Sequence, residues 1–273
     1  MKEVKKGVMD ILLYGIVFVV VQLIVSFLGM FVWTLVQHEE LADVRTAMLS
    51  GHNPVLLALT SVFSSVITLV VFLKAQWTPI SRNYLLSRPW LTLLWVALFA
   101  LGAMIPLEFV YEHIGLEMDE STGRIFEGLL REPWGYVAVG ILAPLTEEVV
   151  FRGAILRTLL GMMSKRNHWV AIMISAAIFG AVHGNAAQFV NALFMGLLLG
   201  WMYYRTRSLV PGILLHWVNN TMAYILTNLL PHTDGKLIDL FHGDEKTVYY
   251  AVGFSLCILI PSFLQIVSRM KKA

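Results

Sequence analysis

Two adjacent glutamates and an arginine stand in the otherwise apolar stretch LAPLTEEVVFRGAILR, at residues 142–157. Successive residues of an α-helix are about 100° apart, so Glu147 and Glu148 need not share a partner. Glu148 and Arg152 are four residues apart with the acid first, a spacing that favours an ion pair on one helix face. Glu147 is then left facing another direction, where it could act as a general base.

Two further polar pairs occur in apolar segments. Phe179 and His183 belong to FGAVH, and His216 and Asn220 belong to HWVNN, so each pair shares one face of a helix. A single histidine in such a segment is more often a helix–helix hydrogen-bonding group than a catalyst. Together with Glu147, however, two imidazoles and an amide would supply a base and hydrogen-bond donors around a water molecule. The structural alternative is that Glu147 is protonated or bonded across helices.

The composition places these polar residues in a membrane. The chain is 58% hydrophobic and 14% charged, against about 45–50% and 25% for ordinary globular domains. Its mean hydropathy is +0.71. A net charge of +2 gives no indication of a nucleic-acid partner, and a single cysteine, Cys257, excludes an internal disulfide and a multi-cysteine metal cluster.

Eight apolar segments have about the length that spans a bilayer. We therefore expect an all-α, polytopic membrane protein with about eight transmembrane helices and, because the connections are short, one membrane domain over residues 1–273. The predicted spans are 8–37, 54–74, 90–111, 134–160, 168–187, 188–205, 209–230 and 247–268.

Charge alternates along the connections between these spans. The basic set is Lys2, Lys5 and Lys6, then Lys74, Arg82 and Arg88, then Arg157, Lys165 and Arg166, then Arg205 and Arg207, then Arg269, Lys271 and Lys272. The acidic set is Glu39, Glu40 and Asp43, then Glu112, Glu117, Asp119 and Glu120, then Asp234, Asp239, Asp244 and Glu245. The positive-inside rule then predicts that both termini are cytoplasmic.

The polar residues do not all fall at one predicted depth. At about 1.5 Å per residue, Glu147 and His183 lie roughly 20 and 22 Å from the cytoplasmic ends of their spans, whereas His216 lies only about 10 Å along its span. Two depths agree and the third does not.

Several residues receive structural interpretations. Pro144 removes a helix hydrogen bond and predicts a kink, and Gly196 and Gly200 form a GxxxG helix-contact pair. Ile125, Phe126, Leu129 and Leu130 make one apolar face, which predicts either an interfacial helix or a plain loop. Lesser roles are expected for Glu108 (snorkelling to the interface), Asn185 and Asn191 (capping or helix contact) and Asn219 (pointing about 100° away from Asn220).

The three motifs together resemble a known family. EEVVFR, FGAVH and HWVNN match EExxxR, FxxxH and HxxxN in that order, and so resemble the CAAX prenyl protease and bacteriocin-processing family of intramembrane proteases. The resemblance covers a protease core of approximately residues 134–222. It implies an endopeptidase that cleaves a peptide or membrane-protein substrate near the membrane.

The resemblance also implies residue roles. Glu147 and His183 would activate water, and His216 and Asn220 would stabilise the tetrahedral oxyanion. Glu148 and Arg152 would support them, and Phe179 would pack.

A metal is a separate question. Glu147, His183 and His216 form a two-histidine, one-carboxylate set that could bind Zn²⁺, but the helical zinc signature HExxH is missing. We favour water activation without a cofactor, with zinc as the alternative.

Two other functions compete with proteolysis. Intramembrane Glu, His and Arg also build the relays of a proton-coupled transporter, although no inverted repeat is evident. The second competing function is that of a catalytically idle membrane scaffold or immunity protein of the same family.

The substrate is a separate question. Eukaryotic relatives cleave prenylated cytoplasmic proteins, which a cytoplasm-facing cavity would suit. The short loops favour a bacterial plasma membrane, where relatives mature peptides. Neither substrate nor oligomeric state follows from the sequence.

Overall fold

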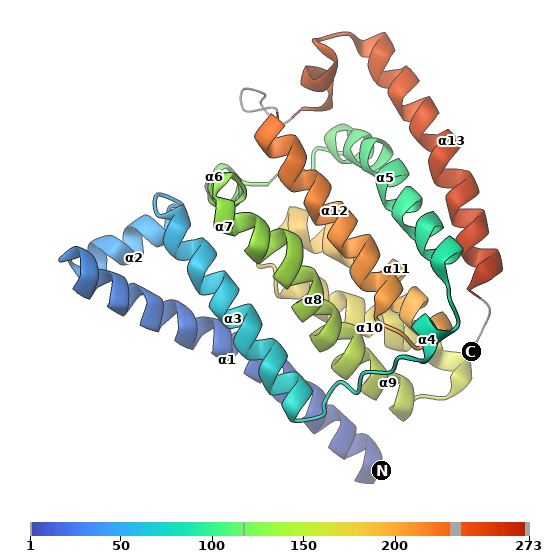
Figure 1. The fold of residues 1–273 in the computed structure, drawn as a ribbon, viewed down its shortest axis with the longest axis horizontal. Coiled ribbons are helices and arrows are strands. Elements are labelled where there is room, and N and C mark those ends of the chain that lie inside the picture. The colour runs from blue at the N-terminus through green and yellow to red at the C-terminus, as the bar shows by residue number, and fades with distance from the viewer. Residues whose placement is uncertain (1, 117, 230–235, 271–273) are drawn as a thin grey trace.

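The computed structural model describes residues 2–116, 118–229 and 236–270, and every regular element in these ranges is helical (Figure 1). Glu117, Asp234, Lys271 and Lys272 of the charge pattern, and position 230 at the predicted end of a span, lie outside the described residues. The first half contains α1 (Lys2–Gln37), α2 (Leu41–Leu49), α3 (Pro54–Lys74), α4 (Asn83–Leu86), α5 (Trp90–His113) and α6 (Glu120–Arg131). The second half contains a continuous helix over residues 133–162, then η3 (Lys165–Asn167), α10 (His168–Ala181), α11 (Ala186–Thr206), α12 (Val210–Leu229), η4 (Leu237–Phe241) and α13 (Glu245–Arg269).

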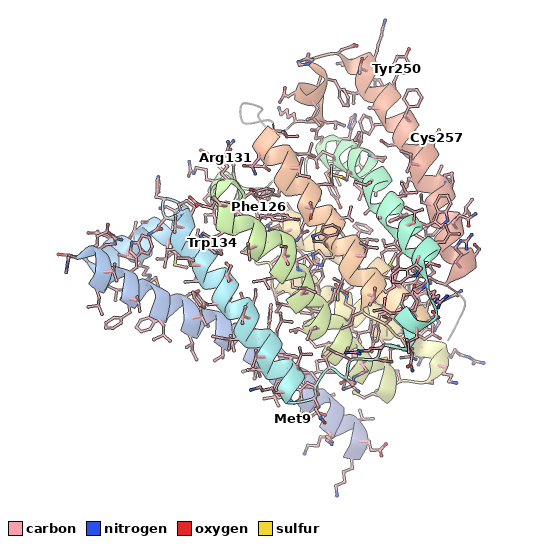
Figure 2. All side chains as sticks on the ribbon, viewed as in Figure 1. Met9, Phe126, Arg131, Trp134, Tyr250 and Cys257 are labelled. Carbon is pink, nitrogen blue, oxygen red and sulfur yellow. The ribbon has the colours of Figure 1, made fainter. Side chains whose placement is uncertain are left out.

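Five helices are long and apolar enough to cross a membrane, namely α1, α3, α5, α11 and α13. Large apolar side chains such as Phe27 of α1 and Phe254 of α13 are exposed, and Figure 2 shows Met9 of α1 and Tyr250 of α13 near opposite edges of the molecule. Lipid would cover these surfaces. The all-α, polytopic membrane fold is therefore confirmed, whereas the count of eight spans and the cytoplasmic position of the termini stay predictions.

The helices form two outer pairs around a central group. The pair α1 and α3 lies on one side and the pair α5 and α13 on the other, with α12, the helix of residues 133–162 and the α10–α11 hairpin between them (Figure 1). The start of α1 and the end of α13 lie at the same end of the molecule, together with the basic connections, whereas α6 and η4 lie at the opposite, acidic end (Figure 1).

The helix of residues 133–162 contains two π-helical segments. It runs through α7 (Pro133–Gly135), η1 (Tyr136–Leu142), α8 (Ala143–Glu147), η2 (Glu148–Leu156) and α9 (Arg157–Met162), with Pro144 between the π segments. Side chains donate to carbonyls of both segments, and such insertions into the hydrogen-bond ladder distort helices. The four bonds join Asn220 to Val139 (2.9 Å), Thr78 to Val149 (2.7 Å), Ser175 to Phe151 (3.1 Å) and Arg157 to Gly153 (3.0 Å).

The predicted span 168–187 is too long. Helix α10 ends at Ala181 because Gly184, at φ 76°, turns the chain. The carboxamide oxygen of Asn185 then accepts the backbone N–H of Gln188 at 2.8 Å and caps α11, as expected for this asparagine. His183 therefore lies in a turn and not on a helix face.

The amphipathic segment before the central helix is indeed helical. Asp119 caps α6 by accepting the backbone N–H of Thr122 at 2.9 Å, and hydrogen bonds from Ser121 and Thr122 lower the pKa of this carboxyl. The α6 residue Leu130 is buried, while Phe126 lines a cavity. The helical alternative is confirmed over the plain loop.

The GxxxG pair marks a close helix crossing. A Cβ atom on Gly196 would lie 2.8 Å from Cβ of Ala176, and one on Gly200 would lie 2.9 Å from a methyl group of Ile172. Both neighbours belong to α10, so the predicted helix contact is confirmed and joins α11 to α10.

This crossing is tested by comparing alanine at two glycines. We expect Gly196→Ala to lower the free energy of unfolding in detergent, because the new methyl group meets the backbone of α10. Gly253→Ala in α13 is the control, since a Cβ there meets nothing within 4 Å. It should be neutral or stabilising by up to about 1 kcal/mol. Equal effects of the two substitutions would contradict the close crossing.

Candidate active site

A buried ion pair lies at the centre of the site. Nη1 of Arg152 donates to Oε1 of Glu148 at 2.7 Å, and both side chains are 1% exposed. The i,i+4 spacing predicted this pair. Carboxylate and guanidinium are both costly to bury, so each depends on the other for charge compensation.

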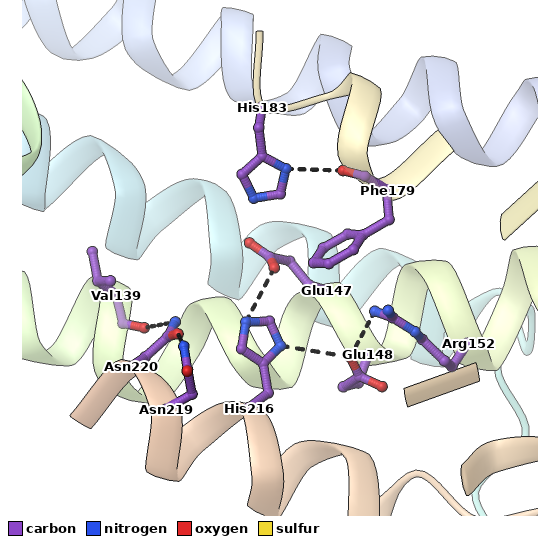
Figure 3. A network of polar contacts seen from close by, with 9 residues as sticks. All are labelled: Val139, Glu147, Glu148, Arg152, Phe179, His183, His216, Asn219 and Asn220. Atoms are coloured by element: carbon purple, nitrogen blue, oxygen red, sulfur yellow. Dashed lines mark hydrogen bonds and ion pairs between the residues drawn. The ribbon is translucent and has the colours of Figure 1, made fainter. Parts of the chain in front are cut away.

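His216 lies between the two glutamates (Figure 3). Its Nε2 is 3.6 Å from Oε2 of Glu147, and its Nδ1 is 3.5 Å from Oε1 of Glu148. These distances suit ion pairs and are longer than ordinary hydrogen bonds. The two glutamates therefore share one partner, which their spacing left open, because one imidazole contacts both carboxylates from its two sides.

The predicted difference in depth disappears in the structure. The end of α9 and the start of α12 match the predicted span ends within a few residues. The depths nevertheless agree, because these two helix ends do not lie at one level. Figure 1 shows α9 continuing beyond the start of α12. Gly212 permits the close approach, because a Cβ atom there would lie 2.7 Å from Oε2 of Glu148. The sequence signal was a glycine one helical turn before His216.

His183 approaches Glu147 from the opposite side to His216 (Figure 3). Its Nδ1–H donates to the carbonyl of Phe179 at 2.8 Å, because a carbonyl only accepts. In the neutral ring Nε2 is then an acceptor. Glu147 thus lies between two imidazoles that different segments supply.

Phe179 contacts several members of the site. Its ring is 2% exposed, and the guanidinium carbon of Arg152 lies 4.4 Å from the ring centroid. The ring also meets His183 and His216 edge-on, with centroids 5.1 and 6.1 Å apart. Besides packing, it forms a cation–π contact with the buried arginine.

Asn220 and Asn219 both take part, although only Asn220 was expected to. Nδ2 of Asn220 donates to the carbonyl of Val139 at 2.9 Å, and Nδ2 of Asn219 donates to Oδ1 of Asn220 at 3.2 Å. The amide nitrogen of Asn220 carries two N–H groups, so its second N–H can donate to another acceptor. Both asparagines line the same cavity, although neighbouring residues of a helix point about 100° apart.

A cavity of about 850 Å³ contains these side chains. Glu147, Phe179, His183, His216, Asn219 and Asn220 line its inner part. Glu108 lines the cavity further along, and its snorkelling to the membrane interface stays a prediction. Tyr111 donates to Oδ1 of Asn191 there at 3.1 Å, so Asn191 makes the expected helix contact, between α5 and α11.

The zinc alternative rests on Glu147, His183 and His216. Within residues 2–116, 118–229 and 236–270, no three His, Cys, Asp or Glu side chains are arranged to hold a metal ion. Zinc at Glu147, His183 and His216 therefore stays an untested alternative, and water activation without a cofactor stays a prediction.

Comparison with known proteins agrees with the three motifs. Residues 130–222 match the family model of the type II CAAX prenyl endopeptidases, Rce1-like. The resemblance seen in the motifs is confirmed for this segment. Glu147, His183, His216 and Asn220 all fall inside it.

Two curated bacterial proteins are similar to this chain. YdiL of Bacillus subtilis (strain 168), named as a membrane peptidase, is 30% identical over 142 residues, which are 50% of this chain and 57% of that protein. The membrane-embedded CAAX protease MroQ of Staphylococcus aureus (strain USA300) is 27% identical over 148 residues, which are 52% of this chain and 59% of MroQ. The chain thus spans little more than half the length of either relative. No solved structure gives a significant match.

The buried ion pair predicts a large loss of stability when one partner is removed. Arg152→Met leaves the carboxylate of Glu148 buried without its main partner, which costs about 3–5 kcal/mol. Unfolding in detergent measures the change. Arg124→Met is the matched control, because the Arg124–Glu120 pair has side chains 60% and 86% exposed and should contribute about 0–1 kcal/mol. Similar losses in both variants would contradict a structural role of the buried pair.

Proposed function

We propose that this chain is an intramembrane endopeptidase in which Glu147 and His183 activate a water molecule without a metal. The observation that carries the proposal is the position of Glu147 on a cavity wall between two imidazoles, beside a buried, charge-compensated Glu148–Arg152 pair. Peptide hydrolysis needs a base for water and donors for the oxyanion, and both kinds of group line one cavity. The names of the two bacterial relatives support the same reaction class.

In the proposed reaction, the Glu147 carboxylate accepts a proton as water attacks the carbonyl carbon of the peptide bond. Nε2 of His183 accepts a hydrogen bond from the same water, since its Nδ1–H is held by Phe179. Nε2–H of His216 and an N–H of Asn220 donate to the oxyanion. Glu147 then returns its proton to the leaving amine as the C–N bond breaks.

Glu148 and Arg152 act through His216 in this proposal. In this proposal His216 carries a proton on both ring nitrogens. Its Nδ1–H faces Oε1 of Glu148, with the two heavy atoms 3.5 Å apart, and this contact orients the ring with Nε2–H toward Glu147. Arg152 in turn fixes the Glu148 carboxylate. These two are positioning residues, since neither lines the cavity.

The lining of the cavity favours entry of the substrate from the acidic end of the molecule. Its exposed lining residues include Met118, Glu127 and Lys236, which belong to the α6 and η4 end. Toward the basic end, close packing of α11 on α10 and the buried Glu148–Arg152 pair fill the interior. If the basic connections face the cytoplasm, the substrate is a peptide or membrane-protein segment at the outer side. A prenylated cytoplasmic protein would need the opposite opening.

Replacement of Glu147 tests catalysis. Glu147→Gln should fold normally and release no product peptides, because the amide cannot accept the proton of water. Mass spectrometry of peptides released from membranes with wild type or variant measures this, with and without a zinc chelator. Glu108→Gln, which removes another cavity carboxylate, should retain cleavage.

The outcomes of that experiment separate the alternatives. Wild-type peptides that persist in chelator favour the glutamate mechanism, and their loss in chelator favours zinc. Identical profiles for wild type and Glu147→Gln, with both proteins folded, favour the idle scaffold or the proton-coupled transporter.

Cysteine labelling of intact cells tests the side of entry independently of catalysis. In a Cys257→Ser background, a membrane-impermeant maleimide should label Lys236→Cys at the cavity rim and spare Arg166→Cys at the basic end. Labelling of lysed cells controls for reactivity at both positions. The reverse pattern in intact cells would place the cavity opening on the cytoplasmic side.

A further inference from the structure

A second pocket, of about 450 Å³, lies at the basic end of the molecule. It forms where the loop after α4 and the first turn of α5 meet the ends of α11 and α13. Its lining consists of Tyr84, Ser87, Arg88, Pro89, Leu91, Thr92, Arg205, Thr206, Arg269 and Met270. None of these residues lines the catalytic cavity, so the pocket is a separate feature.

Three arginines from three different segments line this pocket, and no acidic residue among those that the structure describes lines it with them. No carboxylate lines it, and across the described ranges Arg88, Arg205 and Arg269 belong to no ion pair. Nε of Arg205 donates to the carbonyl of Met270, and Nε of Arg269 donates to Gln265 at 2.9 Å. Those bonds orient two of the guanidinium groups and leave their terminal N–H groups available.

Uncharged donors face the same space. Helix α5 begins here with Pro89 at its N-cap and no side-chain cap, so the free amides and positive dipole of its first turn are uncompensated. The hydroxyl of Tyr84 is buried and has no hydrogen-bond partner among the described residues. Burial raises the pKa of Tyr84 to about 12, which keeps this hydroxyl protonated as a donor.

We propose that this pocket binds the phosphate group of an anion, such as an anionic phospholipid headgroup. Guanidinium groups match phosphate oxygens in pairs, and a helix N-terminus adds backbone donors. The pocket also lies at the shared end of α5, α11 and α13, among the basic connections, where headgroups would lie if these apolar helices span the bilayer. Basic pockets between transmembrane helices on the cytoplasmic side commonly hold such headgroups. The bound phosphate would connect the ends of α5, α11 and α13.

Lipid retention tests this site with the whole protein. The purified chain is placed in nanodiscs of phosphatidylcholine with or without phosphatidylglycerol, and lipids retained after release are counted by native mass spectrometry. Wild type should retain phosphatidylglycerol in preference to phosphatidylcholine. Each of Arg88→Gln and Arg269→Gln should weaken that retention about five-fold, because each removes one phosphate contact. Arg166→Gln removes the same charge outside the pocket and should match wild type.

Two further arms identify the source of the phosphate and the role of the tyrosine. Inorganic phosphate raises the unfolding temperature in neutral detergent if the pocket accepts free phosphate, and leaves it unchanged if only a headgroup binds. Tyr84→Phe should keep or raise stability without lipid, because it removes an unpartnered buried hydroxyl, and should weaken phosphate binding.

The site is contradicted by two results. One is an equal loss of retention in Arg166→Gln and the pocket variants, which would mean a general attraction to the basic surface. The other is the absence of any effect of both lipid and inorganic phosphate on the folded wild-type protein.

Discussion

The charge pair of Glu148 and Arg152 is the constraint on which the rest of the structure depends. Two ions buried to 1% exposure destabilise an apolar interior unless each has a partner in good geometry. The helices around them are arranged accordingly: Gly212 lets α12 approach the carboxylate, and Phe179 covers the guanidinium. His216 then enters between the glutamates because it is held on the same helix face as Gly212.

Much of this arrangement could be predicted from local spacing. The i,i+4 rule predicted the pair at the centre, hydropathy predicted the membrane fold, and the motifs indicated the family matched by residues 130–222. Prediction failed where the answer depended on contacts between helices. The relative level of α9 and α12, the shared use of His216 and the inclusion of Asn219 all follow from packing, which no single segment specifies.

The π-helical segments show the same limit at the level of the backbone. Residues 136–156 have the composition of an ordinary apolar helix, and the wider turns coincide with donors that come from other elements. Thr78 follows α3, Ser175 belongs to α10, and Asn220 belongs to α12, yet each hydroxyl or amide bonds a carbonyl of the central helix. The local geometry beside Glu147 is thus set by residues distant in sequence.

The bond between the His183 ring and the carbonyl of Phe179 ties a loop residue to the register of the helix before it. Loops ordinarily accept insertions and serve as junctions between exchanged segments. The turn between Ala181 and Gly184 differs, since one residue added before His183 would rotate the imidazole away from Glu147 while leaving both helices intact. Chimeras with related membrane proteins therefore require the α10–α11 hairpin to be transferred as one block, turn included.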